Sequence, residues 1–137
     1  MVDFTTSMAV AASGLRAQSE RMKTIAENIA NANSAAATPG GDPYRRQIPT
    51  VTANFDRELN ANMVQAGKPV ADQSEFRSQY DPGNPMADTK GYVKMPNVNS
   101  LIEIMDMREA QRSYEADLSV MDASKTMMAR TVDLLKK

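Results

Sequence analysis

Apolar residues recur at alternating steps of four and three at both ends of the chain. This heptad spacing predicts two amphipathic helices, from about residue 3 to 33 and from about residue 99 to 135. Two stripes of matching period in one chain are most simply satisfied against each other, so we expect an antiparallel helix pair. Its intrachain seam is expected to contain Met8, Ala12, Leu15, Met22, Ala26 and Ile29 from the first helix, and Ile104, Met107, Tyr114, Leu118, Met121, Met128, Val132 and Leu135 from the second.

Further apolar residues lie beside this seam on both predicted helices. A two-helix pair would leave them in water, and exposed apolar stripes of that length are typical of sites of association. The alternative is that the middle of the chain folds back over the helices, which its polar composition and few large side chains disfavour. We therefore expect another molecule to cover these residues, which are Val10, Ile25, Leu101, Ile102, Met105, Val120, Met127 and Leu134.

The middle of the chain differs in composition from its ends. All seven prolines lie between residues 39 and 96, so helices are not expected there. Alternation at Val51, Ala53 and Phe55 predicts a short strand with one buried face, while residues 80–85 predict a turn and residues 90–98 another extended piece. The sequence thus predicts a mainly α fold, with a helix in residues 1–34, a linker and small β-hairpin-like, turn-rich module in residues 35–97, and a helix in residues 98–137.

An asparagine-rich helix end separates the first helix from the middle. Asn28 and Asn31 are three apart and share a helix face, where their amides can bridge to a neighbouring helix. Asn33 suits the left-handed position that closes a helix, and the Pro39-Gly40-Gly41 sequence follows it. The alternative is that the asparagines are ordinary exposed helix-end residues.

The composition restricts the chemistry that the chain can perform. The 137 residues contain neither cysteine nor histidine, which removes thiolate chemistry, most zinc sites and the usual general base. Sixteen basic and 17 acidic residues give a formal net charge of -1, so nothing points to nucleic acid as a partner. Asp81 and Asp88 are the nearest candidates for acid–base chemistry, but turn carboxylates usually stabilise their own backbone. We expect no enzyme activity, metal, cofactor or small-molecule substrate.

The chain is not expected to enter a membrane. Its apolar runs are short and charges recur throughout, so no transmembrane segment is predicted. The stretch "AVAAS", residues 9–13, is similar to a signal-peptide cleavage site, but neither a basic region nor a long apolar stretch precedes it. If the protein leaves the cytoplasm, we expect it to do so uncleaved.

Three stretches of the chain resemble those of a known protein family. They are "SGLRAQSERMKTIAENIANANS" (residues 13–34) followed by "PYRR" (43–46), "YDPGNPMADTKGYVKMPNVNS" (80–100) and "EIMDMREAQRSYEADLSVMDASKTMM" (103–128). The first resembles the N-terminal signature of flagellar rod, hook and hook-associated axial proteins, and the other two are similar to the proximal rod members. Asp117 stands where that family usually has asparagine, and residues 56–79 match least well.

The resemblance implies a structural subunit of the flagellar basal body. Its two terminal helices would form an antiparallel coiled-coil inner domain, and its copies would stack helically into a hollow rod. That rod would cross the periplasm, transmit torque and conduct later subunits, and the protein would be exported uncleaved from the cytoplasm by the flagellar type III apparatus. The implied partners are other copies of itself, other proximal rod proteins, the adaptor joining rod to membrane ring, the MS ring and distal rod proteins.

Within such a rod, Asn28 and Asn31 are expected to fix helix register at a subunit interface. A hinge is expected at Asn33, Pro39, Gly40 and Gly41. The alternative function is a soluble coiled-coil adaptor or export chaperone that holds a single partner. It would explain the helices equally well, but it would not need the asparagines together with the central motif, and a chaperone is expected to form a discrete dimer.

Overall fold

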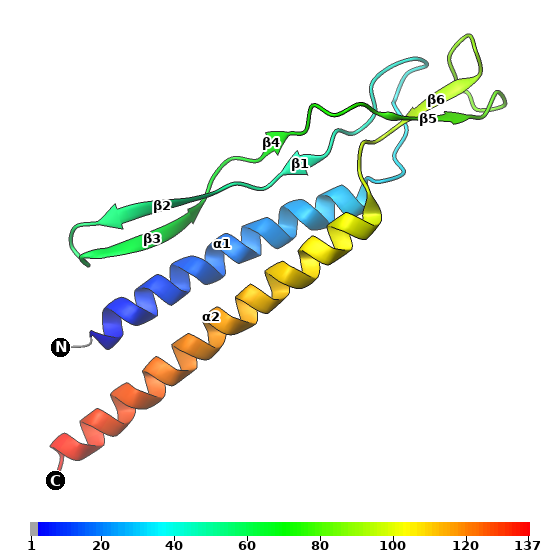
Figure 1. The fold of residues 1–137 in the computed structure, drawn as a ribbon. Coiled ribbons are helices and arrows are strands. Elements are labelled where there is room, and N and C mark those ends of the chain that lie inside the picture. Colours follow the sequence, from blue (N-terminus) through cyan, green and yellow to red (C-terminus); the bar gives the residue numbers. More distant parts are fainter. Residues whose placement is uncertain (1–2) are drawn as a thin grey trace. The chain divides into compact units, whose positions relative to one another are not determined.

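Two long helices and six short strands form residues 3–137, the part of the chain that the computed structural model describes (Figure 1). The helices are α1 (Phe4–Ala30) and α2 (Ser100–Leu135), which confirms the two predicted helices. The strands between them are β1 (Gln47–Ile48), β2 (Val51–Asp56), β3 (Ala61–Ala66), β4 (Val70–Ala71), β5 (Arg77–Tyr80) and β6 (Tyr92–Met95).

Both helices begin at a capping side chain. Asp3 Oδ1 accepts hydrogen bonds from the backbone N–H of Thr5 (2.9 Å) and Thr6 (3.3 Å), and Asn99 Oδ1 accepts one from Leu101 N–H (3.1 Å). These caps satisfy N–H groups that have no partner within the helix. Hydrogen bonds from Thr6 lower the pKa of the Asp3 carboxyl, so Asp3 carries a negative charge at the positive end of the α1 dipole.

The strands pair as three antiparallel two-stranded sheets. β1 pairs with β4 (Gln47 opposite Ala71), β2 with β3 (Val51 opposite Ala66) and β5 with β6 (Tyr80 opposite Tyr92). Proline has no N–H to donate to a ladder. Pro49 and Pro69 therefore separate the β1–β4 ladder from the β2–β3 ladder.

The strand predicted at Val51, Ala53 and Phe55 is present as β2, but its predicted buried face is wrong. The Val51 and Phe55 side chains are 47% and 58% exposed. The reason is that β3, and not β2, faces α1, because Val64 N–H donates a hydrogen bond to Ser13 Oγ (3.1 Å).

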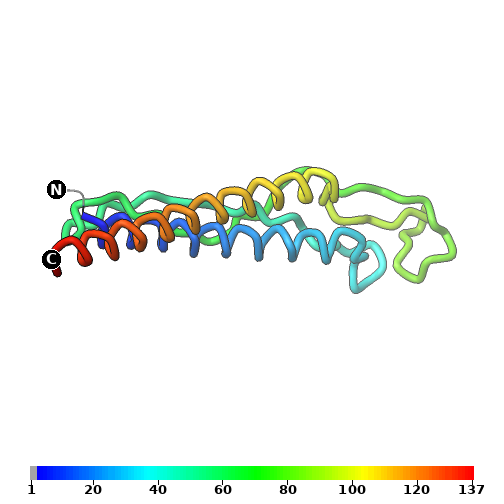
Figure 2. The backbone as a smooth tube through the Cα atoms, turned by 90° about the horizontal axis from the view of Figure 1, so that it is seen from below, coloured from blue at the N-terminus to red at the C-terminus, as the bar shows by residue number. Residues whose placement is uncertain are grey.

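The chain divides into two compact units. Unit 1 contains residues 3–22, Thr50–Gly67 and Arg108–Lys137, and unit 2 contains Lys23–Pro49 and Lys68–Met107. Each unit holds part of α1, part of α2 and part of the middle segment. Within each unit α1 and α2 run side by side in opposite directions, and in unit 1 the β2–β3 hairpin lies beside α1 (Figures 1 and 2). The middle segment therefore does fold back along a helix, which was the alternative that we disfavoured.

Small side chains form part of the core of unit 1. Ala11, Ala17 and Ala110 are buried in unit 1, with exposed fractions of 5%, 1% and 0%. At Gly14 an added Cβ would lie 2.6 Å from Asp117 Oδ2, so α1 and the Asp117 side chain are in close contact. An ion pair between Arg21 and Glu109 (3.7 Å) is exposed on its acidic side, and such pairs contribute little to stability.

The buried positions of α2 lie beside those that the heptad pattern predicted. Glu103, Ala110 and Ser124 are the buried residues of α2, and they are separated by multiples of seven. Of the predicted seam, Met107, Tyr114, Met121 and Met128 of α2 and Met8, Ala12, Leu15, Met22 and Ile29 of α1 are partly buried, whereas Ala26, Ile104, Leu118, Val132 and Leu135 are exposed.

Gly91 closes the loop between β5 and β6 with a backbone conformation that favours glycine. Its φ is +84°, its N–H donates to Asp88 O (3.1 Å), and its carbonyl accepts from Asp81 N–H (2.9 Å). A Cβ at this position would lie 3.0 Å from Tyr80 Cε2 and 3.1 Å from Pro82 Cβ. Both the φ angle and the space therefore require glycine.

We predict that Gly91→Ala lowers the free energy of unfolding by about 1 to 3 kcal/mol, because alanine is strained at positive φ. Urea denaturation followed by circular dichroism measures this change. Gly83→Ala is the matched control in the same loop, since its φ is not positive and the nearest atom to an added Cβ is Asp81 Oδ1 at 3.9 Å. The control should change stability by less than about 0.5 kcal/mol; equal losses in the two variants would contradict this account.

Candidate functional site

Asn28 lies at the centre of a buried hydrogen-bond network in unit 2. Its side chain is 0% exposed. Nδ2 donates to Gln47 O (2.8 Å) and Glu103 Oε2 (3.2 Å), while Oδ1 accepts from Gln47 N–H (2.9 Å) and Tyr44 OH (2.7 Å). Two donors and two acceptor positions are the full capacity of an amide. Asn28 therefore joins α1, the segment before β1 and α2 inside one chain.

The structure assigns a different role to two residues predicted at a subunit interface. Asn28 has no remaining hydrogen-bonding capacity, and Ile25 is only 1% exposed in the core of unit 2. Neither side chain has surface with which to contact a neighbouring subunit, because both face the interior. Asn31 is partly exposed and its Nδ2 donates to Glu27 O (2.9 Å) on its own helix, so its predicted place at an interface stays a prediction.

Glu103 is a buried carboxylate that is paired with a guanidinium. It is 1% exposed, and Arg46 Nε donates to Glu103 Oε1. Arg46 also lies 3.4 Å from Asp72 Oδ2 and 3.6 Å from Asp106 Oδ2. The hydrogen bond to Glu103 is the main cause that raises the pKa of Arg46. A buried charge without such a partner would be strongly destabilising, so Arg46 and Glu103 depend on each other.

The "PYRR" segment carries the partners of both buried helix residues. Burial, followed by the charges of Glu27 and Glu103, raises the pKa of Tyr44, so its hydroxyl stays protonated and donates to Asn28. Arg45 lies over the Phe76 ring, 4.2 Å from its centroid, and donates to Asp72 O (2.9 Å). The segment therefore fastens the middle of the chain to α1 and α2 of unit 2.

Asn97, in the stretch before α2, organises the same region. Its Oδ1 accepts from Arg46 N–H (2.8 Å), and its Nδ2 donates to Asp72 O (3.0 Å) and Ser74 O (3.1 Å). The neighbouring Arg77 donates to Pro96 O and to Ala32 O, each at 3.2 Å. We name Asn28, Tyr44, Arg46, Asp72, Asn97 and Glu103 the polar junction.

Sequence reasoning missed most of the polar junction. Tyr44 and Arg46 appeared only as part of a family motif, and Asn97 and Glu103 were not singled out. One signal was available for Glu103, because it begins the seven-residue series that continues with Ala110, Asp117 and Ser124 along α2. An acidic residue at such a position indicates a buried partner of opposite charge.

The predicted hinge contains a β-turn and a helix end. Gly41 N–H donates to Thr38 O (3.0 Å) across Pro39 and Gly40, and Gly40 has a φ of +69°. Asn33 does not have the predicted left-handed conformation, since Asn60 is the non-glycine residue with positive φ in the described chain. α1 is closed instead by backbone bonds such as Ser34 N–H to Asn31 O (3.1 Å). Flexibility at these residues stays a prediction.

The apolar residues predicted beside the seam of α2 form an exposed set. Charged residues recur along the same helix, and no helix in the described part of the chain is both long and apolar enough to cross a membrane. Val10, on α1, is only partly buried. We name the exposed set the outer apolar residues; they are 50% to 73% exposed and comprise Leu101, Ile102 and Met105 in unit 2, and Val120, Met127 and Leu134 in unit 1.

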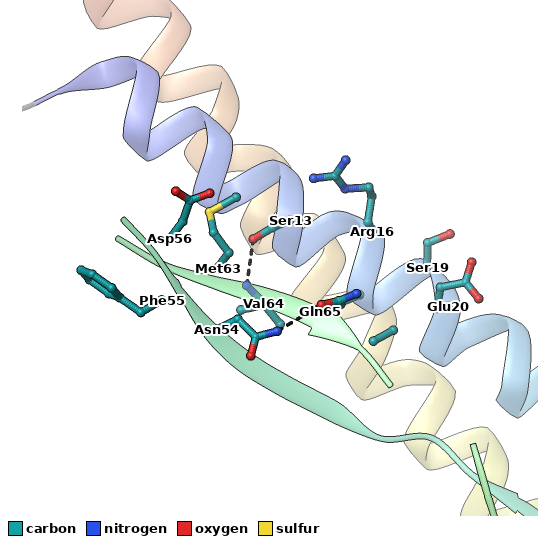
Figure 3. Close-up of a pocket in the computed structure, with 12 residues that line it drawn as sticks. Ser13, Arg16, Ser19, Glu20, Asn54, Phe55, Asp56, Met63, Val64 and Gln65 are labelled. Atoms are coloured by element: carbon teal, nitrogen blue, oxygen red, sulfur yellow. Dashed lines mark hydrogen bonds between the residues drawn. The ribbon is translucent and has the colours of Figure 1, made fainter. Parts of the chain in front are cut away.

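A groove of about 640 Å³ lies between α1 and the β2–β3 hairpin of unit 1 (Figure 3). Ser13 Oγ accepts from Val64 N–H at its base, and Asn54 Nδ2 donates to Gln65 Oε1 (3.1 Å) along its side. Phe55 stands at its rim with 58% of its surface exposed. Because the chain has no histidine or cysteine, this mixed lining suits side-chain packing better than acid–base chemistry.

The carboxylates considered for acid–base chemistry stabilise a turn. Asp88 Oδ1 accepts from Lys90 N–H (2.8 Å) and Tyr92 N–H (3.0 Å), and the bond from Tyr92 is the largest cause that lowers the pKa of Asp88. Asp81 Oδ2 accepts from Asn84 Nδ2 (3.4 Å). Both carboxylates therefore support their own loop, as expected of turn residues.

Comparison with known proteins defines the class to which these helices belong. Residues 8–37 match the family described as flagella basal body rod protein. Residues 89–134 match the family described as flagellar basal body rod FlgEFG protein C-terminal. The matched ranges cover most of α1 and nearly all of α2, so both helices belong to the class of flagellar basal-body rod domains.

Similar proteins cover nearly the whole chain. The flagellar basal-body rod protein FlgC of Agrobacterium fabrum is 51% identical over 93% of this chain and 91% of that protein. FlgC of Escherichia coli O6:H1 is 39% identical (91% and 92% covered), and FlgC of Aquifex aeolicus is 35% identical (99% and 100% covered). The chain belongs to the FlgC family of flagellar basal-body rod proteins, which are structural components and not enzymes.

We predict that Asn28→Leu lowers the free energy of unfolding by about 3 kcal/mol or more. Leucine removes four hydrogen bonds and leaves Glu103, Tyr44 and both backbone groups of Gln47 without this partner in a buried site. Urea denaturation measures the change. Asn31→Leu is the matched control on the same helix, because it removes a bond to its own helix and should cost less than about 1 kcal/mol. Similar losses in both variants would show that the junction does not depend on Asn28.

Acid should weaken the polar junction through Asp72. Hydrogen bonds from Ser74, followed by Arg46, lower the pKa of Asp72 from its ordinary value of 3.8. A lowered pKa in the folded state stabilises the protein above the unfolded-state pKa, and this contribution is lost as pH falls through the folded-state pKa.

We predict that Asp72→Asn makes the free energy of unfolding depend less on pH below about pH 4, the range in which aspartate titrates. Urea denaturation at a series of pH values tests this. Asp133→Asn, which removes an exposed carboxylate from α2, should leave the acid limb close to that of the unchanged chain. An unchanged acid limb in Asp72→Asn would contradict the prediction.

Proposed function

We propose that the chain is a structural subunit of the proximal rod of the bacterial flagellar basal body, whose copies polymerise helically into a hollow shaft. The observation that carries this proposal is the set of outer apolar residues on α2, which the chain itself leaves exposed. Large apolar side chains repeated along a helix are typical of surfaces that another protein covers. The chain belongs to a family of rod proteins, and in a rod the outer apolar residues would be covered by neighbouring subunits.

In this proposal the two helices form the inner part of the rod. Residues 1–34 and 98–137 make an antiparallel coiled-coil inner domain, and residues 35–97 make the linker and the small outer module. The opposite directions of α1 and α2, and the close approach of Asp117 on α2 to Gly14 on α1, support this arrangement. The outer apolar residues, together with Val10 and Asn31, would then contact neighbouring subunits.

The polar junction suits a subunit that transmits torque. A force on the middle segment of unit 2 reaches α1 through Asn28 and α2 through Glu103, because Tyr44, Arg46 and Gln47 bond to both helices. Buried hydrogen-bond networks hold a defined geometry more firmly than apolar contacts, which can slide. A hinge at Asn33, Pro39, Gly40 and Gly41 would let the linker adapt to slightly different positions in the rod.

Assembly with other rod and basal-body proteins follows from the family, and the particular partners are part of this proposal. They are other copies of the chain, the other proximal rod proteins, the adaptor joining rod to membrane ring, the MS ring and the distal rod proteins. The rod would cross the periplasm, and its lumen would conduct later subunits outward. The chain would reach it uncleaved through the flagellar type III export apparatus.

The proposal is tested in a flagellated strain that lacks its own copy of the gene. Expression of the tagged chain should restore swimming, and the tag should be found in isolated basal bodies at the mass of the uncleaved chain. A tag found only as a discrete soluble dimer would instead indicate an adaptor or chaperone, which the comparisons do not favour.

We predict that Met105→Asp prevents assembly without unfolding the chain. Met105 is 61% exposed, so a charge there meets water in the monomer but would be buried at a subunit interface. The number of intact basal bodies per cell should fall at least fivefold, while circular dichroism of the purified chain stays the same.

Gln111→Asp is the matched control, since it places the same residue at an exposed polar position of the same helix. It should support normal swimming. Normal swimming of Met105→Asp would remove Met105 from the proposed interface.

A further inference from the structure

Strand β2 has an open edge on the side of its hairpin that lies away from α1 (Figure 1). Gly67 N–H donates to Thr50 O (2.9 Å), and this bond sets the alternation of the ladder, in which every second residue of β2 directs its backbone N–H and C=O away from β3. The bond from Val64 N–H to Ser13 Oγ fits this alternation, because Val64 lies opposite Ala53 and directs its N–H away from β2. The outward residues of β2 are exposed, and their outward backbone groups make no hydrogen bond within residues 3–137; they are Val51, Ala53 and Phe55.

Strand β5 of unit 2 has a second open edge. Asp81 N–H donates to Gly91 O (2.9 Å), so the alternation of this ladder directs the backbone groups of Ser78 and Tyr80 away from β6. Both residues are exposed, and their outward groups make no hydrogen bond in the described part of the chain.

The other strand edges of the described chain are covered or interrupted. The Asn28 amide occupies the edge of β1, and β3 lies against α1. On β6, Asp88 bonds to both backbone groups of Tyr92, and on β4 the carbonyl of Ala71 accepts from Gln73 Nε2 (3.3 Å). Within residues 3–137, β2 and β5 are therefore the strands whose successive outward residues are all free.

Neither open edge is protected against pairing. A strand edge with free N–H and C=O groups is a template for another strand, and proteins usually protect such an edge with lysine, proline or a bulge. β2 and β5 contain neither lysine nor proline, and each pairs one to one with its partner strand. An open-ended assembly needs contacts in which a surface meets a different surface of the next copy. Two different open edges meet this requirement.

We propose that β5 of one copy of this chain adds to the open edge of β2 of a second copy as an antiparallel strand, with Ser78 opposite Phe55 and Tyr80 opposite Ala53. Each of these two pairs exchanges backbone hydrogen bonds in both directions, and the β2–β3 hairpin becomes a three-stranded sheet. The inference rests on the proposed function, since it concerns copies that are neighbours in a rod.

The side chains on one face of this sheet favour the proposed register. Directly opposite residues share a face, and diagonal neighbours remain within reach of an aromatic ring. Tyr80 and Phe55 are 65% and 58% exposed, and in this register each lies opposite a small residue, Ala53 or Ser78. The Tyr80 ring then has room between Val51 and Phe55, which are its diagonal neighbours.

The other face pairs charges of opposite sign. Arg77 lies opposite Asp56, and Gln79 lies opposite Asn54. Arg77 donates through Nε and Nη2 within its own chain, which leaves Nη1, and Asp56 Oδ1 accepts from the turn after β2, which leaves Oδ2. A shift of the register by two residues either places Arg77 opposite Asn54 or moves Arg77 past the end of β2.

A disulfide tests the contact and its register together. Two differently tagged chains, one with Asn54→Cys and one with Gln79→Cys, are expressed together in the strain that lacks its own gene, and isolated basal bodies are mildly oxidised. In the proposed register the two positions form a non-hydrogen-bonded pair with Cα atoms about 4.5 Å apart, which is within the range of a disulfide. The chain has no other cysteine, so a covalent dimer that carries both tags is expected.

Gln65→Cys paired with Gln79→Cys is the matched control for this disulfide. Gln65 is exposed on β3 of the same hairpin, so in the proposed sheet it lies two strand spacings, or about 10 Å, from β5 of the other copy. This pair should give no dimer.

Proline at Ala53 tests the backbone pairing. The Ala53 N–H points outward, so Ala53→Pro removes a donor from the open edge and leaves the ladder with β3 in place. The number of basal bodies per cell should fall at least fivefold. Asn62→Pro is the matched control, because Asn62 is an outward residue of β3 and takes no part in the proposed pairing; it should leave the number within twofold of normal. The urea midpoint of both purified variants should match that of the unchanged chain.

The outcomes separate the two proposals. If the unchanged chain is absent from basal bodies, the proposed function fails and this inference fails with it. If the chain is present but the Asn54–Gln79 dimer does not form, or forms no more readily than the Gln65–Gln79 dimer, only this inference is overturned. Normal basal bodies in Ala53→Pro would also overturn it. A dimer between Thr52→Cys and Asn54→Cys would show β2 paired with β2 of the second copy instead. If Ala53→Pro lowers the urea midpoint, the disulfide alone decides.

Discussion

The buried amide of Asn28 is the interaction on which unit 2 depends. Its four hydrogen bonds connect α1 to the backbone of Gln47, to Tyr44 and to Glu103. A buried amide that loses a partner costs free energy, so each of these groups must be in place for the others to be satisfied. Glu103 in turn requires Arg46, and Arg46 is positioned by Asn97. The geometry of the whole region thus follows from one side chain that water cannot reach.

Unit 1 buries few large apolar side chains and leaves several of them exposed. In unit 1 the buried side chains are small, as at Ala11, Ala17 and Ala110, and Val64 N–H of β3 donates a hydrogen bond to Ser13 Oγ of α1. Larger apolar side chains of α2 in the same unit stay exposed, among them Leu118, Val120 and Leu134. In this chain hydrogen bonds hold the interior, while large apolar side chains are exposed and available to contact neighbouring molecules.

The sequence was sufficient to locate the two helices, but it was not sufficient to predict which side of each helix is buried. Heptad spacing located both helices to within a few residues, because an apolar period of 3.5 residues indicates a helix whatever that helix packs against. It placed Ile104 and Leu118 in the seam, but both are exposed, whereas the neighbouring Glu103 is buried and Asp117 is partly buried. Apolar spacing alone does not identify a buried polar side chain. Asn28 was assigned to a subunit interface because its partners within the chain lie 16 to 75 residues away, and spacing along one helix contains no information about them.

A shaft that turns under load places opposite demands on its subunits. Contacts between subunits must fit many copies, for which non-directional apolar contacts are suitable. Contacts within a subunit must keep one geometry while force passes through it, for which directional hydrogen bonds are suitable. The division seen in this chain, with Asn28, Arg46 and Glu103 inside and the outer apolar residues of α2 exposed, matches both demands.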